Sequence, residues 1–127
     1  MLDGFEPLVI ASGTPYLAVT KNGVAFNKSV VEKMEKAEFI QLFIDRNGRR
    51  FAISKCEKDD ENSLRFYRGR DVSDGVRMNN SDLRETLSDL AQKDSNAGFR
   101  VRGSYQPQEH ALIFDLSDPE PIRKSSK

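Results

Sequence analysis

Arginines in the second half of this 127-residue chain have a type and spacing that could do chemistry. Arg100 and Arg102 lie two positions apart, and residues at that spacing point to the same face of a strand. A guanidinium can donate two parallel hydrogen bonds to a phosphate or a base edge, and the ring of Tyr67 could stack nearby. The arginines of this half are Arg65, Arg68, Arg70, Arg77, Arg84, Arg100 and Arg102.

Basic residues of the first half extend this candidate set, and several of them flank expected turns. Twenty basic and twenty acidic residues cancel in the whole chain, which weakens the field that attracts phosphate. The arginines therefore have an alternative interpretation as a solvated sheet face, paired with Asp71, Asp74, Asp82 and Glu85. If the chain contacts DNA, the predicted contacts are Arg100, Arg102, Arg77, Arg84, Arg65, Lys21, Arg49 and Arg50.

Catalytic and metal chemistry is not indicated by the remaining residues. His110 is the only histidine and Cys56 the only cysteine, so the sequence indicates neither a zinc site nor a Cys–His nucleophile pair. Gly69 and Gly75 are not followed by the Lys-Ser/Thr of a phosphate-binding loop. The acidic run at 57–62 lacks the ligand spacing of a calcium loop. We expect a protein that is not an enzyme and holds no cofactor or metal.

Composition indicates a soluble globular protein, with 37% hydrophobic and 31% charged residues. A single cysteine cannot form an internal disulfide, which favours a reducing compartment. The chain shows no apolar run of membrane-spanning length and no secretory signal at its N-terminus. We therefore expect a cytoplasmic location and no membrane partner.

The elements that must position the arginines follow from a sequence repeat. Residues 23–31 and 75–83 both read Gly-Val-x-(large apolar)-Asn-x-Ser-x-(apolar). Self-similarity of this kind indicates a duplicated unit. We expect each copy to consist of a hairpin, a helix and a second hairpin.

The first copy is predicted to begin with strands at 16–20 and 24–26, joined by a type I′ turn at Asn22-Gly23. A short helix should run from Asn27 or Ser29 to Lys36, with a capping box formed by Ser29 and Glu32. The run 39–44 is apolar on both faces and is expected to be covered on two sides. A turn at 46–49 then leads to a strand at 51–54.

The second copy is predicted to repeat this plan. Strands are expected at 64–68 and 76–78, with a longer loop at 69–75 between them. A helix should run from Asn80 or Ser81 to Gln92, because Leu83, Leu87 and Leu90 have helical spacing. Strands at 99–102 and 110–114 follow, with a turn at 106–109.

The predicted organisation is α+β, mainly β: a pseudo-two-fold β-barrel built from two hairpin-helix-hairpin repeats that share one core. Its parts are an irregular lead-in at 1–14, the first repeat at 15–56, a charged linker at 57–62, the second repeat at 63–116 and a flexible tail at 117–127. Such a chain would be a monomer with pseudo-two-fold symmetry or a homodimer.

This order of elements resembles the SpoVT/AbrB-like swapped-hairpin barrel, here as a tandem repeat in one chain. The resemblance rests on residues 22–27, 39–44 and 51–53 with Val30 and Met34, and on residues 75–79, 99–102 and 112–114 with Leu83. It implies a bacterial DNA-binding transcriptional regulator that contacts duplex DNA through basic turns and strand faces.

A second function stays open on the sequence. Val24 and Val76 stand where DNA-binding members of that family carry arginine after the turn glycine. This difference and the balanced charge favour the alternative of a protein-binding module. Examples are an antitoxin-like partner or a phage-borne inhibitor, such as an anti-CRISPR or other anti-defence protein, of a nucleic-acid-binding host protein.

Overall fold

A computed structural model describes residues 13–69, 75–94 and 97–121 of the chain. The expected lead-in at 1–12, the loop residues 70–74 with Arg70, Asp71 and Asp74, and the tail residues 122–127 lie outside the described residues. The described elements are β1 (Tyr16–Thr20), β2 (Gly23–Phe26), α1 (Lys28–Lys33), β3 (Phe39–Asp45), β4 (Arg50–Cys56), β5 (Leu64–Arg65), β6 (Val76–Met78), α2 (Ser81–Ala91), β7 (Phe99–Gln106), a 3-10 helix η1 (Pro107–Glu109), β8 (Ala111–Asp115) and β9 (Glu120–Pro121).

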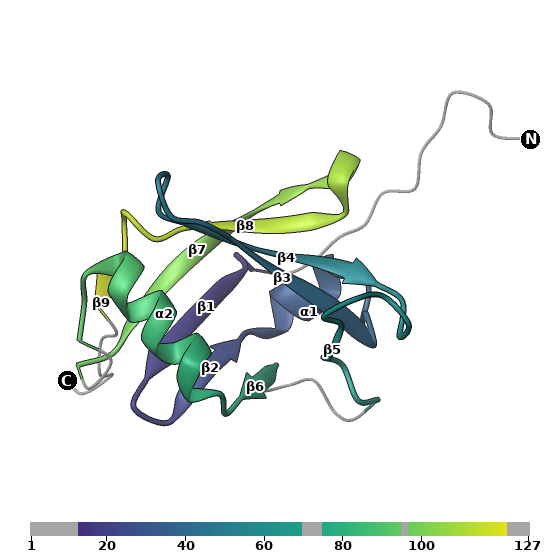
Figure 1. Cartoon of the computed structure of the whole chain (residues 1–127), viewed down its shortest axis with the longest axis horizontal. Coiled ribbons are helices and arrows are strands. Elements are labelled where there is room, and N and C mark those ends of the chain that lie inside the picture. Colours follow the sequence, from purple (N-terminus) through teal and green to yellow (C-terminus); the bar gives the residue numbers. More distant parts are fainter. Residues whose placement is uncertain (1–12, 70–74, 95–96, 122–127) are drawn as a thin grey trace, which may run out of the picture.

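The strands form an antiparallel half-barrel, which confirms the α+β, mainly β class (Figure 1). Along the sheet the order is β5-β3-β4-β8-β7-β1-β2-β6, and β9 pairs with β7 off this path. Both helices pack against β1 and β2. Among the described residues, no helix combines the length and the apolar composition that a membrane crossing needs.

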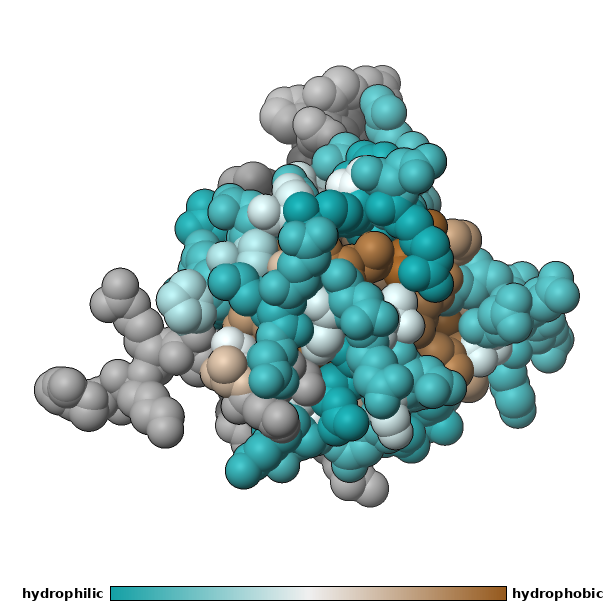
Figure 2. All heavy atoms as spheres, turned by 60° about the vertical axis from the view of Figure 1, so that its left-hand side comes forward, coloured by the Kyte–Doolittle hydropathy of each residue, from teal (hydrophilic) through white to brown (hydrophobic). Residues whose placement is uncertain are grey.

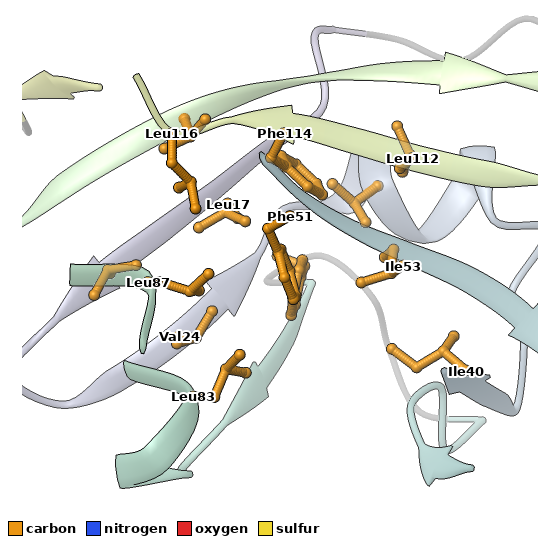
Figure 3. Packing of buried hydrophobic residues seen from close by; sticks show 14 of the residues in the cluster. Leu17, Val24, Ile40, Phe51, Ile53, Leu83, Leu87, Leu112, Phe114 and Leu116 are labelled. Atoms are coloured by element: carbon orange, nitrogen blue, oxygen red, sulfur yellow. The ribbon is translucent and has the colours of Figure 1, made fainter. Parts of the chain in front are cut away.

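The core lies inside the curve of the sheet, where apolar side chains from all parts of the path meet (Figure 3). Alternation along each strand points Leu17 and Val19, and likewise Phe51 and Ile53, inward. Phe26 contacts the rings of Phe66 and Phe114, with centroids 5.5 and 6.2 Å away. A single core therefore joins strands that are far apart in the sequence.

The two helices confirm the predicted positions but not the predicted cap of the first. α1 ends earlier than expected, and its N-cap is Asn27, whose side chain accepts from the amide of Val30. Ser29 does not form a capping box; it is buried and its hydroxyl donates to the carbonyl of Gly13. α2 is capped in the same way by Asn80, and its predicted leucine stripe is buried.

The first predicted Asn-Gly turn differs from expectation, whereas the second lies at 46–49 as predicted. Thr20 pairs directly with Gly23, so the turn consists of Lys21 and Asn22, and only Gly23 has a positive φ, of 129°. A type I′ turn would need positive φ at both central residues. In the loop between β3 and β4, the left-handed residue is Arg49 rather than Gly48.

Several predictions about individual strands are wrong. β3 is not covered on two sides, because Phe43 is 51% exposed and Ile44 41% exposed. β5 is short, and Leu64 is exposed rather than inward, although Phe66 is buried as expected. The expected flexible tail contributes β9, which pairs with Phe99 and Arg100.

Candidate nucleic-acid interface

One outward face of the sheet gathers three of the predicted arginines. On β7, β1 and β2 the inward positions are apolar and buried, and on β6 they are apolar and partly buried, so alternate residues point outward. Arg100 lies opposite Ala18, Ala18 opposite Ala25, and Ala25 opposite Arg77. Arg102 lies opposite Tyr16 on the same face. We call this surface the arginine face; it comprises Tyr16, Ala18, Ala25, Arg77, Arg100 and Arg102.

Between its basic side chains, the arginine face carries small, uncharged residues. Ala18 of β1 and Ala25 of β2 lie on the two strands that separate Arg100 from Arg77, and each presents only a methyl group. Three strand spacings of about 4.8 Å place these arginines roughly 14 Å apart along the sheet. That span is similar to the ~12 Å width of the major groove of B-DNA.

Tyr16 orients two of the arginines. The guanidinium carbon of Arg100 lies 4.3 Å from the centre of the Tyr16 ring, and that of Arg102 lies 5.9 Å away. Nη2 of Arg102 also donates to the Tyr16 hydroxyl over 3.3 Å. This hydrogen bond is the main cause that raises the pKa of Arg102 above its ordinary value. Both cations are therefore held over one ring, and both arginines remain exposed residues.

Glu120 is the acidic residue that pairs with this face. Its Oε1 accepts from Nε of Arg100 over 3.2 Å, because β9 pairs alongside β7. Arg77 and Arg102 form no ion pair with another described residue. The described part of the face thus keeps an excess of positive charge.

Lys21 lies beside this face, at the exposed turn between β1 and β2. Its carbonyl accepts from Nη1 of Arg84 over 2.9 Å, so Arg84 ties α2 to that turn. The Nε atom of Arg84 is buried and has no hydrogen-bond partner. Arg84 therefore stabilises the packing of α2. Of these two residues, only Lys21 remains a candidate DNA contact at this turn.

Of the other predicted contacts, Arg50 lines one hollow together with Arg102, and Arg65 lines another together with Arg77, but neither belongs to the row on the arginine face. Nε of Arg49 donates to the carbonyl of Leu90 over 2.7 Å. Arg50 pairs with Asp45 at 2.7 Å, and Arg65 pairs with Glu38 at 3.4 Å. All three side chains are therefore held by local contacts, two of them with carboxylates.

The roles of Tyr16 and Glu120, and the small residues Ala18 and Ala25 between the arginines, were not predicted from the sequence. Tyr67 was predicted as the stacking ring, but Tyr67 is half-buried against the core. The alternation of Tyr16, Ala18 and Thr20 was visible in the sequence and marked an outward face. Nothing in the sequence said that this face would lie beside Arg100 and Arg102, because the β1–β7 pairing joins residues more than 80 positions apart.

The residues with metal or nucleophile chemistry do not form a second site in the described part of the chain. There, no group of three or more His, Cys, Asp or Glu residues is arranged to hold a metal. Cys56 is half-exposed, and burial, with smaller effects from Asp60 and Glu57, raises the pKa of its thiol. His110 lies at a turn with a left-handed backbone.

Comparisons with models of known protein families, with curated proteins and with solved structures found no match for this chain.

Proposed function

We propose that this protein binds duplex DNA through the arginine face. The observation that carries the proposal is the transverse row Arg100–Ala18–Ala25–Arg77, with Arg102 beside it. Small residues between the arginines let a phosphate backbone approach the sheet while guanidinium groups donate from both sides. The mechanism is binding, without a chemical step.

The sign of the charge on the two outward surfaces supports this choice. On the arginine face, three arginines are opposed by Glu120, which pairs with Arg100, and by Asp118, which lies near Arg102. On β3, β4 and β8 the corresponding outward row contains Asp45, Arg50 and Asp115, which lie opposite one another and leave no basic excess. A phosphate chain is therefore attracted to one side of the half-barrel.

We further propose that the fold is a duplicated swapped-hairpin barrel of the SpoVT/AbrB-like kind. The strand register supports it. Aligning Gly23 with Gly75 makes Ala25 the counterpart of Arg77, and these two residues lie opposite each other in the β2–β6 pair. A two-fold axis between two strands places one residue opposite its own counterpart and pairs the flanking residues reciprocally, as Val24 with Met78 and Phe26 with Val76 do here.

Two other strand pairs correspond to each other under the duplication. Leu17 of β1 lies opposite Val101 of β7, and Leu64 of β5 lies opposite Ile40 of β3. Under the proposed duplication, β1 corresponds to β5 and β7 to β3. Fold likeness alone does not assign a function, so the regulator role suggested by that family depends here on the arginine face.

Titration of a labelled DNA duplex across a salt series tests the proposal. Wild-type affinity should fall steeply with salt, and replacing Arg77, Arg100 and Arg102 together by alanine should reduce the slope of log K against log salt by about three. Glu120→Gln should strengthen binding, because it removes the acid that neutralises Arg100.

The matched control is the triple variant Lys36→Ala, Lys58→Ala and Lys93→Ala, which removes the same charge from exposed positions off the arginine face. It should change affinity much less than the arginine variant does. Equal losses in the two variants, or no wild-type binding at low salt, would contradict DNA binding through this face.

A further inference from the structure

A groove runs along the open side of the half-barrel, between β3 and β5 on one side and β6 and α2 on the other. It consists of two hollows with volumes near 320 and 430 Å³. Both are lined by Leu42, Asn80 and Leu83, so they are continuous. We call this feature the seam groove.

The seam groove collects exposed apolar surface. The large hydrophobic residues that are exposed in the described part of the chain are Phe43, Ile44 and Leu64, and all three line it. Figure 2, which turns the left-hand side of Figure 1 forward, shows a hydrophobic area set among hydrophilic side chains. Concentrated apolar surface of this kind marks a site for a partner.

Free strand edges border the same groove. β5 pairs with β3 only at Phe39 and Ile40, so residues 41–45 of β3 have no described strand on that side. β6 pairs with β2, and no described strand pairs along its other edge. Unpaired backbone amides and carbonyls next to an apolar groove are what an added strand requires.

The rim of the seam groove is basic. Arg46, Arg65, Arg68 and Arg77 line it, against Asp82 as the acidic lining residue. Arg65 is paired with Glu38, whereas Arg46 and Arg68 form no ion pair with another described residue. An occupant that carries carboxylates would complement these charges.

We propose that the seam groove binds an extended, acidic segment of a partner protein, which adds a strand to the free edge of β3. Alternate side chains of the segment would enter the apolar hollows, and its Asp or Glu residues would face the arginine rim. The five free residues of β3 match a segment of about six residues, a usual strand length. This site is separate from DNA binding, although Arg77 borders both surfaces.

Selection from a random peptide library on the immobilised full chain tests this proposal. The double variant Ile44→Ser with Leu64→Ser serves for counter-selection. Both residues are exposed, so the double variant should unfold at nearly the same urea concentration as the wild type. Selected peptides should alternate apolar and acidic residues. A labelled peptide should bind the double variant at least about tenfold more weakly than the wild type.

Three controls separate the seam groove from other surfaces. Arg46→Glu with Arg68→Glu should also weaken peptide binding by about tenfold or more, and N-methylation of alternate peptide amides should abolish it. Ile113→Ser, on the outward face of β8, should leave peptide binding unchanged. DNA affinity should be unaffected by Ile44→Ser with Leu64→Ser, so either proposal can fail alone.

Several results would overturn the proposal. These are selection of no peptide, selection of basic or purely apolar peptides, and binding that tolerates N-methylation. Sedimentation showing a wild-type dimer that dissociates in the Ile44→Ser, Leu64→Ser variant would assign the groove to a second copy of this chain instead.

Discussion

Gly75 illustrates, at the scale of a single residue, how a repeated position controls strand pairing. Its φ is +77°, and a Cβ built there would overlap the carbonyl oxygen of Phe26. Gly23, its counterpart in the sequence repeat, has a φ of +129° and would place a Cβ 2.7 Å from the carbonyl oxygen of Met78. Each glycine thus allows β2 and β6 to approach closely.

Gly75→Ala should therefore destabilise the protein more than a left-handed backbone alone explains. The backbone conformation costs about 1–2 kcal/mol for a residue with a Cβ. The overlap with Phe26 should add roughly 1–3 kcal/mol, because β2 and β6 must separate. Urea unfolding monitored by circular dichroism measures the total.

Gly69→Ala is the matched control for that measurement. Gly69 has nearly the same φ, +79°, but a Cβ there would meet nothing within 4 Å. The control variant should show the backbone cost alone. Equal losses in the two variants would mean that the β2–β6 approach is looser than described.

At the scale of elements, α2 is fixed by an arginine at each end. Arg84 reaches from the helix to the turn between β1 and β2, and Arg49 reaches from the β3–β4 loop to the carbonyl of Leu90 in the last turn of the helix. A cation at a helix C-terminus also interacts favourably with the helix dipole. The two predicted DNA contacts thus join separate hairpins to one helix.

Arg49→Ala should lower the free energy of unfolding by about 1–2 kcal/mol, since it removes a charged hydrogen bond and the dipole interaction. Alanine keeps the Cβ at this left-handed position, so the backbone cost is nearly unchanged. Hydrogen exchange should become faster in the last turn of α2. Arg46→Ala, in the same loop, is the control and should have little effect; similar losses would refute the role given to Arg49.

Acid should weaken the same end of the sheet. The amide of Gly48 and the side chain of Arg50 lower the pKa of Asp45 below its ordinary 3.8, and Ser117 does so for Asp115. A lowered folded-state pKa stabilises the protein above the unfolded pKa, and this contribution is lost as pH falls through the folded value. Stability should therefore decline as pH falls below about 4.

Thermal unfolding across this range measures the decline. Asp45→Asn with Asp115→Asn should flatten it, because the two titrating groups are gone. A decline as steep as that of the wild type in this double variant would assign the acid sensitivity to other carboxylates.

At the scale of the whole molecule, the half-barrel is open on one side. β5 and β6 lie at the two ends of the strand path, and no described strand joins them. Their counterparts under the proposed duplication, β1 and β2, form a hairpin through a two-residue turn. The longer connection between β5 and β6 takes the place of that turn, and the seam groove lies where the barrel would close.

Most of the local structure could be predicted from residue patterns alone. Alternation of apolar residues predicted the inward positions of β1 and β4, and helical spacing predicted the buried leucines of α2. These patterns depend on neighbours within a few residues, which is why they can be read from one chain. They also identified Arg100 and Arg102 as sharing a face.

Which faces and edges meet depends on contacts between distant parts of the chain. The tertiary structure brought Tyr16 and Glu120 to Arg100, directed Arg49 and Arg84 into the packing of α2, and left Phe43 and Ile44 exposed on β3. Each of these outcomes depends on strand pairs or contacts between distant parts of the chain. Such pairing is set by the shared core and by loop lengths, and it cannot be predicted from local residue patterns.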